Sequence, residues 1–358
     1  MIFDSKYISN KCRELSSYLL LSKHFFYPVL GMLTLFTLPA LVNGCSSDLL
    51  DEGQTVSSEI TIIQNTQPEI QNGSLDIMVF NDNSLKRLDS YQRFDNWSTT
   101  DIKIASRSGD KIILAIANSG IGPLDWTQIN SLESTCGLKA HLKDDSIGKP
   151  IMSGGTKLHA GTDSNIKELE MVPLSSIVEV RSIRCDFSGL PYAGEHITEA
   201  KAYLLNINSE CSFIADGNVM PLSIINYGKL CYSDLEAFTE QDILIHYFSN
   251  QIGTEWVRDA AKLICFPNSA EEESPGSPFT KLVIEGKISG NTYYWTIPIN
   301  RTGVSDEPGI HRNRRYIYDI DIRRKGTTEP DININAEAIT FKMEIEKWEE
   351  KDNYEVRF

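Results

Sequence analysis

The chain has 358 residues, which is longer than one ordinary domain and predicts two. Hydrophobic residues make up 41% and charged residues 23% of the sequence, which excludes a wholly disordered or a collagen-like chain. The formal net charge is −15, and a chain this acidic is a poor ligand for a phosphate backbone, so we expect no nucleic-acid partner.

Residues 1–44 have the pattern of an export signal. They contain four basic side chains against two acidic ones, although the rest of the chain is strongly acidic. Residues 25–42 carry no charge, and this run is slightly shorter than the roughly 20 apolar residues of a membrane span. Pro28 and Pro39 disfavour one straight helix there. A basic segment, an apolar segment and the small Gly44 predict a signal peptide over 1–44.

Cys45 follows the apolar run directly, and residues 41–45 (LVNGC) resemble a bacterial lipobox, although Asn43 replaces the usual Ala or Ser. In a lipobox the cysteine is acylated, and two or more chains of the palmitate type would anchor the protein stably to a membrane. A plain secretion signal and an uncleaved anchor helix are the alternatives. The polar, acidic residues 45–57 predict a flexible tether. They also resemble the signal that places lipoproteins of Bacteroides-type bacteria on the outer face of the outer membrane.

Period-2 patterns and short apolar runs predict strands through the next part of the chain. The candidates are residues 75–80, 101–105, 111–117, 177–184 and 199–207. One short helix is expected within 125–141, because Trp126, Ile129 and Leu132 are spaced at i, i+3 and i+6.

A domain boundary is expected near residue 212, where a polar run over 206–212 and a turn at 216–218 interrupt the strand pattern. The N-terminal domain is then 58–212 and the C-terminal domain 213–358.

The second half returns to short strands. A weaker helix is expected over 233–248 and a polar surface loop over 270–278. Residues 281–287 and 292–299 predict a hairpin around the tight turn Ser289-Gly290-Asn291. Apolar and polar residues then alternate over 316–323, 339–346 and 354–358. Many short strands separated by turns favour an all-β sandwich fold.

No catalytic or metal-binding motif is present in the sequence. The histidines show neither HxH nor HExxH spacing, and there is no GxSxG, no CxxC and no complete phosphate-loop motif. Residues 153–157 (SGGTK) are interpreted as a simple turn. We therefore expect no enzyme, no cofactor and no metal site.

The cysteines and the basic cluster favour structural roles. With Cys12 in the signal peptide and Cys45 acylated, five cysteines remain, and the pattern assigns no disulfide among them; most are expected to be small buried residues. The run 311–315 (HRNRR) is interpreted as solvated charge at the start of a strand. The five cysteines are Cys136, Cys185, Cys211, Cys231 and Cys265.

Several segments, taken in order, resemble the fimbrillin-like lipoproteins of Bacteroides-type bacteria. The match spans roughly residues 75–358. It implies two tandem transthyretin-like β-sandwich domains and a role in cell-surface fimbriae. The matching segments are 75–94, 114–119 (LAIANS), 151–154 (IMSG), 173–181 (PLSSIVEVR), 280–286 (TKLVIEG), 293–299 (YYWTIPI), 312–313 (RN), 316–318 (YIY) and Trp348.

The resemblance also implies a mode of assembly. Shaft subunits of this family are cut after an arginine, which removes an N-terminal strand and opens a groove that a strand of another subunit fills. Anchor subunits escape the cut and stay lipidated. The present sequence has no Lys or Arg between Cys45 and Leu85, and Lys86 and Arg87 come only after the strand at 75–80. Residues 58–64 (SEITIIQ) would therefore be retained as a first strand.

The sequence thus predicts a fimbrial anchor or accessory subunit. Its partners would be other fimbrial subunits, joined by strand exchange, and the outer membrane, through the lipid on Cys45. The strand at 354–358 either completes its own sandwich or pairs with a neighbour.

Three other functions are weighed against this one. A polymerising shaft fimbrillin would be cut as described above. A surface glycan-binding lipoprotein predicts coplanar exposed aromatics, for example Trp97 and Trp256, although Trp in sandwiches is more often core. An exported hydrolase predicts a pocket with paired carboxylates. The five tryptophans are Trp97, Trp126, Trp256, Trp295 and Trp348.

Overall fold

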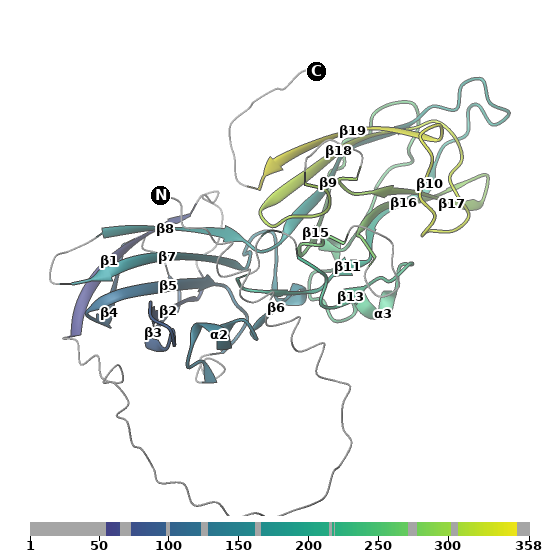
Figure 1. Cartoon of the computed structure of the whole chain (residues 1–358). Coiled ribbons are helices and arrows are strands. Elements are labelled where there is room, and N and C mark those ends of the chain that lie inside the picture. Colours follow the sequence, from purple (N-terminus) through teal and green to yellow (C-terminus); the bar gives the residue numbers. More distant parts are fainter. Residues whose placement is uncertain are drawn as a thin grey trace, which may run out of the picture.

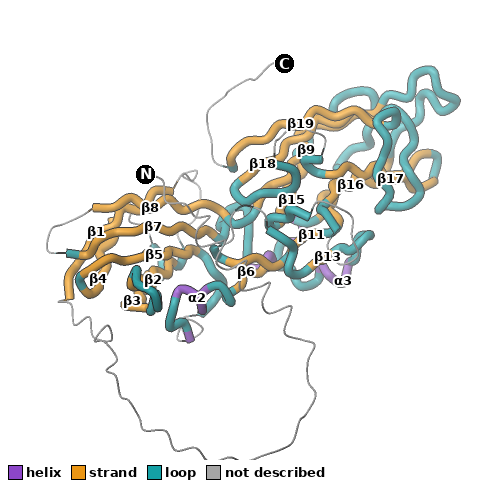
Figure 2. The backbone as a smooth tube through the Cα atoms, viewed as in Figure 1, coloured by secondary structure: helices purple, strands orange, loops and turns teal. Residues whose placement is uncertain are grey.

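A computed structural model of the chain describes residues 55–64, 73–97, 101–122, 128–161, 166–214, 217, 219–270, 278–301 and 307–348. The predicted signal peptide, Cys45, Trp126 and the predicted strand at 354–358 lie outside these residues. Figure 1 shows two neighbouring lobes, and Figure 2 shows that both consist of strands and loops with very little helix. The predicted all-β class is confirmed.

The first lobe is built on one seven-stranded sheet. Its strands are β1 (Thr55–Gln64), β2 (Leu75–Asn81), β3 (Leu88–Phe94), β4 (Asp101–Arg107), β5 (Gly109–Ala117), β7 (Met152–Ala160) and β8 (Ile166–Pro173). Their order across the sheet is β3-β2-β5-β7-β8-β1-β4. Neighbouring strands are antiparallel, except that β1 and β8 are parallel.

The middle of this sheet is buried on both faces, because β2 and β5 are apolar at nearly every position. One face, which includes Ile77 and Ile113, packs in a small core together with residues of β1, β4 and β8. The other face, which includes Phe80 and Leu114, belongs to a larger core that continues into the second lobe. The two lobes therefore share apolar contacts.

The second lobe contains two four-stranded sheets. One has the order β15-β9-β18-β19, with β9 (Ser176–Cys185), β15 (Ala261–Cys265), β18 (Arg314–Ile322) and β19 (Ile339–Lys347). The other has the order β14-β10-β16-β17, with β10 (Thr198–Leu205), β14 (Ile245–Tyr247), β16 (Lys281–Ile288) and β17 (Asn291–Pro298). Tyr203 and Trp295 of one sheet and Tyr316 and Tyr318 of the other are at most 1% exposed and share one apolar core.

The remaining elements are short. They are the pairs β6 (Lys139–His141) with β12 (Glu210–Ser212) and β11 (Ile207–Asn208) with β13 (Ile224–Ile225), the helices α2 (Leu132–Thr135) and α3 (Tyr232–Leu235), and the 3-10 turns η2 (Leu142–Asp144) and η3 (Gln241–Ile243). Among the described residues, no helix has the length and apolar character needed to cross a bilayer.

The predicted hairpin forms as expected. Ile288 pairs with Asn291, so the loop consists of Ser289 and Gly290 alone. Both residues have positive φ, 51° and 80°, which is the conformation of a type I′ hairpin turn. All the predicted strands that lie within the described residues are present.

Both predicted helices are wrong in extent. The helix expected within 125–141 is a single turn over α2, because a capping box at Ser131 starts it there and Lys139–His141 pairs as strand β6. The helix expected over 233–248 is likewise reduced to α3 and η3, and its end forms β14 against β10. In both places strand pairing with a distant segment overrides the local helical spacing.

The strand pairing also bears on the predicted boundaries. β9 and β10 lie in the sheets of the second lobe, so a cut at 212 would separate them from their partners. The pairing favours a division between Pro173, which ends β8, and Ser176, which begins β9. At the N-terminal side, β1 begins at Thr55, so the last three residues of the expected tether belong to a strand.

Residues 153–157 form the middle of β7 rather than the predicted turn. The two glycines are needed there because of close backbone approach. A Cβ atom at Gly154 would lie 2.0 Å from the carbonyl oxygen of Glu170 in β8, and one at Gly155 would lie 3.2 Å from that of Ile113 in β5. Glycine in a strand marks such a contact as readily as a turn.

Candidate functional site

The first strand lies inside its sheet. β1 pairs with β4 over Thr55–Thr61 on one side and with β8 over Glu59–Gln64 on the other. Ile60 at its centre is fully buried in the smaller core. Loss of β1 would leave unpaired backbone groups on two strands and an opened core. The chain therefore completes this sheet with its own strand, as predicted for residues 58–64.

The two outer strands of the same sheet, β3 and β4, are linked by side chains. The Asp89 carboxylate on β3 accepts a hydrogen bond from the backbone N–H of Arg107 on β4 at 2.7 Å. It also lies 3.2 Å from Nζ of Lys111, a side chain that is 1% exposed. The Gln92 side chain, with its amide placed to satisfy both groups, donates to Lys103 O and accepts from Ala105 N. The edges of this sheet are thus occupied within the lobe.

The edge strands of the second lobe differ in whether another segment of the chain covers them. The outer edge of β17 is covered, because Tyr294 exchanges two backbone hydrogen bonds of 2.9 Å with Thr327, and Ile334 N donates to Thr296 O. β19 pairs with β18 from Ile339 to Lys347, and no other described strand lies along its far side. Such an edge offers backbone donors and acceptors to an added strand.

The tryptophans do not form the aromatic pair that the glycan-binding alternative requires. Trp97, Trp295 and Trp348 are buried, whereas Trp256 is 40% exposed. The exposed platform of Trp97 and Trp256 that the glycan-binding alternative requires is not formed, since Trp97 packs in the smaller core. Trp256 is the one exposed tryptophan among the described residues.

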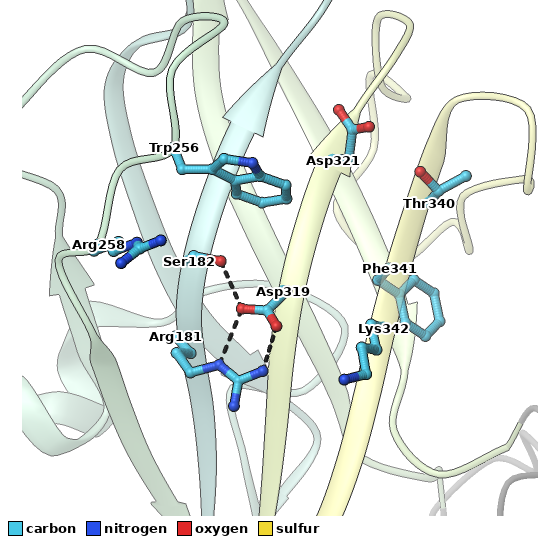
Figure 3. A pocket seen from close by; sticks show the side chains of 9 residues that line it. All are labelled: Arg181, Ser182, Trp256, Arg258, Asp319, Asp321, Thr340, Phe341 and Lys342. Atoms are coloured by element: carbon cyan, nitrogen blue, oxygen red, sulfur yellow. Dashed lines mark hydrogen bonds and ion pairs between the residues drawn. The ribbon is translucent and has the colours of Figure 1, made fainter. Parts of the chain in front are cut away.

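Trp256 lines a pocket of about 700 Å³ on the outer face of the β15-β9-β18-β19 sheet (Figure 3). Strands β9, β18 and β19 and the segment before β15 supply its walls, so it is assembled from regions far apart in the sequence. Its lining residues are Arg181, Ser182, Trp256, Arg258, Asp319, Asp321, Thr340, Phe341 and Lys342.

The carboxylates in this pocket are paired with arginines. Asp319 accepts from Nε of Arg181 at 3.1 Å and from the Ser182 hydroxyl at 2.5 Å, and Arg181 also contacts Glu344 at 3.0 Å (Figure 3). Burial alone would raise the pKa of the Asp319 carboxyl, but the hydrogen bonds from Arg181 and Ser182 outweigh it and hold that pKa below its usual value. A general acid needs the opposite shift, so this pair gives the hydrolase hypothesis no support.

The buried thiols of the described chain likewise offer no reactive centre, and Cys136 is disulfide-bonded. Cys185, Cys211, Cys231 and Cys265 are free thiols, and burial raises the pKa of Cys185 to about 11 and that of Cys211 to about 12. Such thiols are poor nucleophiles at neutral pH. Among the described residues, no three His, Cys, Asp or Glu side chains are grouped as metal ligands.

The basic cluster at 311–315 has a structural role, which corrects the prediction of solvated charge. The Arg312 guanidinium reaches into the first lobe and donates to the carbonyl oxygens of Pro173, Ser153 and Val172 at 3.2, 3.2 and 2.8 Å. Arg315 pairs with Glu179, a side chain that is 4% exposed, at 2.6 Å. Arg312 therefore links the two lobes at the point where β8 ends.

Comparison with known proteins shows which solved structures have a similar fold. No protein-family model and no curated protein matches the sequence. Among solved structures, a putative cell adhesion protein of Bacteroides eggerthii is similar with a TM-score of 0.63 and 13% identity, covering 83% of this chain and 97% of that one. A fimbrilin of Porphyromonas gingivalis gives 0.59 and 12%, covering 82% and 97%.

A putative cell adhesion protein of Parabacteroides distasonis gives a TM-score of 0.62 and 14% identity, covering 83% of this chain and 97% of that one. The chain has the fimbrillin fold. The resemblance found in the sequence is therefore confirmed at the level of the fold, and it extends over both lobes.

Proposed function

We propose that this protein is a cell-surface fimbrial subunit of the anchor or accessory type, held in the outer membrane by acyl chains on Cys45. It would join other fimbrial subunits by β-strand addition. The shared fold supports membership of a fimbrial or adhesive assembly. The position of β1 is the observation that favours an anchor role over the role of a shaft subunit.

A shaft subunit must lose its first strand to open a groove. In this chain β1 is held by strands on both sides, and the sequence from Cys45 to Leu85 offers no Lys or Arg for a trypsin-like cut. A cut at Lys86 or Arg87 would also remove β2, which lies between β3 and β5 in the sheet. The groove of the first lobe therefore stays filled, and the lipid anchor stays attached to the folded protein.

Attachment to the membrane would hold the first lobe close to its surface. Nine residues lie between Cys45 and Thr55, the first residue of β1, and the ten extended Cα-to-Cα steps reach at most about 35 Å. A partner strand would add at the free edge of β19 in the second lobe. Among the described strands of this lobe, β14, β15 and β19 have no strand on their far side, and β19, with nine residues against three and five, offers the longest edge to a second subunit.

The N-terminus of the mature protein tests this proposal. Mass spectrometry of the membrane fraction should find an acylated Cys45 followed by an intact β1. The matched variant Cys45→Ala should leave the membrane fraction or retain its signal peptide, and it should no longer hold fimbrial subunits at the cell surface. A mature N-terminus beyond Gln64 would contradict the anchor role and favour a polymerising subunit. Residues 25–42 still attached to the wild-type protein would contradict the lipobox.

A further inference from the structure

The pocket beside Trp256 lies on the face of the sheet that ends in β19, and it has the features of a ligand site. Its volume of about 700 Å³ is in the range of small-molecule pockets. It combines an exposed indole with charged and hydroxyl groups from three strands. What it could bind follows from the groups that are not already satisfied by the protein.

The indole of Trp256 is held in a fixed position. Val257 exchanges two backbone hydrogen bonds, of 2.8 and 2.9 Å, with Ile183 of β9, which fixes the segment that carries the ring. The Arg184 guanidinium lies 4.8 Å from the ring centroid. In Figure 3 the ring extends from this segment toward Asp321. An exposed, immobilised indole is a stacking surface for the apolar face of a ring-shaped ligand.

Asp321 supplies an unsatisfied acceptor. It is 7% exposed, and its Oδ2 accepts from Arg184 at 3.0 Å and Arg323 at 2.9 Å. Its Oδ1 is buried and has no partner among the described residues. The exposed hydroxyl of Thr340 lines the same pocket. Oδ1 is closed to solvent, so a ligand would meet the remainder of the Asp321 side chain that lines the pocket and the Thr340 hydroxyl, and hydroxyl groups on a ligand suit both.

The cations of the pocket point to a negative group on the ligand. Arg181 is engaged by Asp319 and Glu344, and Lys342 is engaged by Glu344. Arg258 is exposed and makes no ion pair with the described residues. A free guanidinium in a chain of net charge −15 is a natural partner for a carboxylate, which it can bind through two hydrogen bonds.

We propose that this pocket binds an acidic sugar, a pyranose ring that carries a carboxylate. The ring stacks on Trp256, its hydroxyls contact Asp321 and Thr340 where these residues line the pocket, and its carboxylate pairs with Arg258. The site would give the subunit a ligand on a cell surface or matrix. This inference does not depend on the anchor role, because neither β1 nor Cys45 contributes to the pocket.

Titration of the full chain with defined oligosaccharides tests the proposal. The probes are trigalacturonic acid, its neutral galactose counterpart and triglutamate, which carries carboxylates without a sugar ring. We expect calorimetry to show binding of the acidic sugar at least about tenfold tighter than either control probe. Equal binding of the neutral sugar, equal binding of triglutamate, or no binding of the acidic sugar at millimolar concentration would each overturn the proposal.

Three variants assign the contacts. Trp256→Ala should weaken binding of the acidic sugar at least about tenfold, and Arg258→Gln should remove the preference over the neutral sugar. Tyr247→Ala is the matched control, because Tyr247 is 58% exposed on β14, in the other sheet of the lobe. Its affinity should be that of the wild type. Wild-type affinity in Trp256→Ala, with an unchanged circular dichroism spectrum, would contradict the site.

Discussion

The two lobes differ in how the edge strands of their sheets are covered. The first lobe places its N-terminal strand between β4 and β8 and ties β3 to β4 through side chains such as Asp89. The second lobe covers β17 with the segment 327–334 but leaves β19 with one strand partner among the described residues. The first lobe is therefore complete within its own chain, whereas the second retains an edge for a partner.

The difference lies between a sheet that includes its own N-terminal strand and a sheet whose last strand has one described strand partner. A subunit whose first sheet is complete can be tethered at its N-terminus without waiting for a donated strand. The β19 edge lies in the lobe that does not contain β1 (Figure 1). The variants below are ordered by the size of the effect expected on this division, from the largest to the smallest.

Deletion of β1, residues 55–64, should have the largest effect. Two strands would lose their neighbour and the core around Ile60 would open, so we expect the first lobe to lose its cooperative unfolding transition and the protein to aggregate. Differential scanning calorimetry and size-exclusion chromatography measure both. Deletion of residues 46–54 is the control and should leave the transition in place. An unchanged transition after deletion of β1 would remove the argument that this strand is permanent.

Trp295→Ala should destabilise the second lobe by about 3–5 kcal/mol, because a fully buried indole is replaced by a cavity. The substitution also leaves the carbonyl oxygen of Arg324 without the indole N–H that donates to it at 2.9 Å. Denaturant unfolding monitored by circular dichroism measures the loss. The control Trp256→Ala removes the same side chain from an exposed position, 40% exposed, and should cost about 1 kcal/mol or less. Equal losses in the two variants would show that the packing of Trp295 is not what stabilises this lobe.

Arg312→Ala should weaken the link between the lobes by about 2–3 kcal/mol. It leaves three carbonyl oxygens at the ends of β7 and β8 without their charged donor. We expect one calorimetric transition in the wild type and two separated transitions in the variant. Arg314→Ala, a neighbouring arginine at the start of β18, is the control and should keep one transition. Two transitions already present in the wild type would contradict a coupling role for Arg312.

Particular residues show which features of the fold the sequence predicts and which it does not. The alternation over 339–346 predicts β19 directly, because each side chain's face follows from its position in the strand. The strand pairing favours a division before β9 rather than at 212, because β9 pairs in parallel with β18, and Arg181 meets Asp319 across 138 residues of chain. Such pairing leaves no local signal. The Trp256 pocket was missed as a cavity for the same reason, although the sequence singled out Trp256 itself.

The structural roles of the two glycines and of Arg312 could not be predicted for a different reason. A glycine pair and a basic run have the same local appearance whether they lie at the surface or at a close contact. Gly154 is required by the backbone of Glu170, and Arg312 by carbonyl groups of the first lobe. Only the tertiary fold decides between these meanings.

Asp145→Asn should give the smallest effect, and one that depends on pH. Asp145 is 4% exposed, and its Oδ1 accepts from the N–H groups of Ser146 and Ile151, both at 2.9 Å. Burial raises the pKa of this carboxyl from 3.8 to about 7. A group whose pKa is raised on folding stabilises the native state fully below its unfolded pKa and loses that contribution as the pH rises through its folded pKa. Wild-type stability should therefore decline between about pH 4 and pH 7 through this group.

The asparagine variant keeps the oxygen that accepts both backbone hydrogen bonds and removes the titration. It should match the wild type at pH 4 and exceed it at pH 8 by on the order of 2 kcal/mol, as measured by urea unfolding at the two pH values. Asp145→Ala, which removes the acceptor as well, should be less stable than the wild type at pH 4, where the protonated aspartic acid still holds the turn before β7. If the asparagine and wild-type proteins show the same change in stability between pH 4 and pH 8, the Asp145 carboxyl does not titrate in this range, and the turn joining η2 to β7 is held without a buried proton.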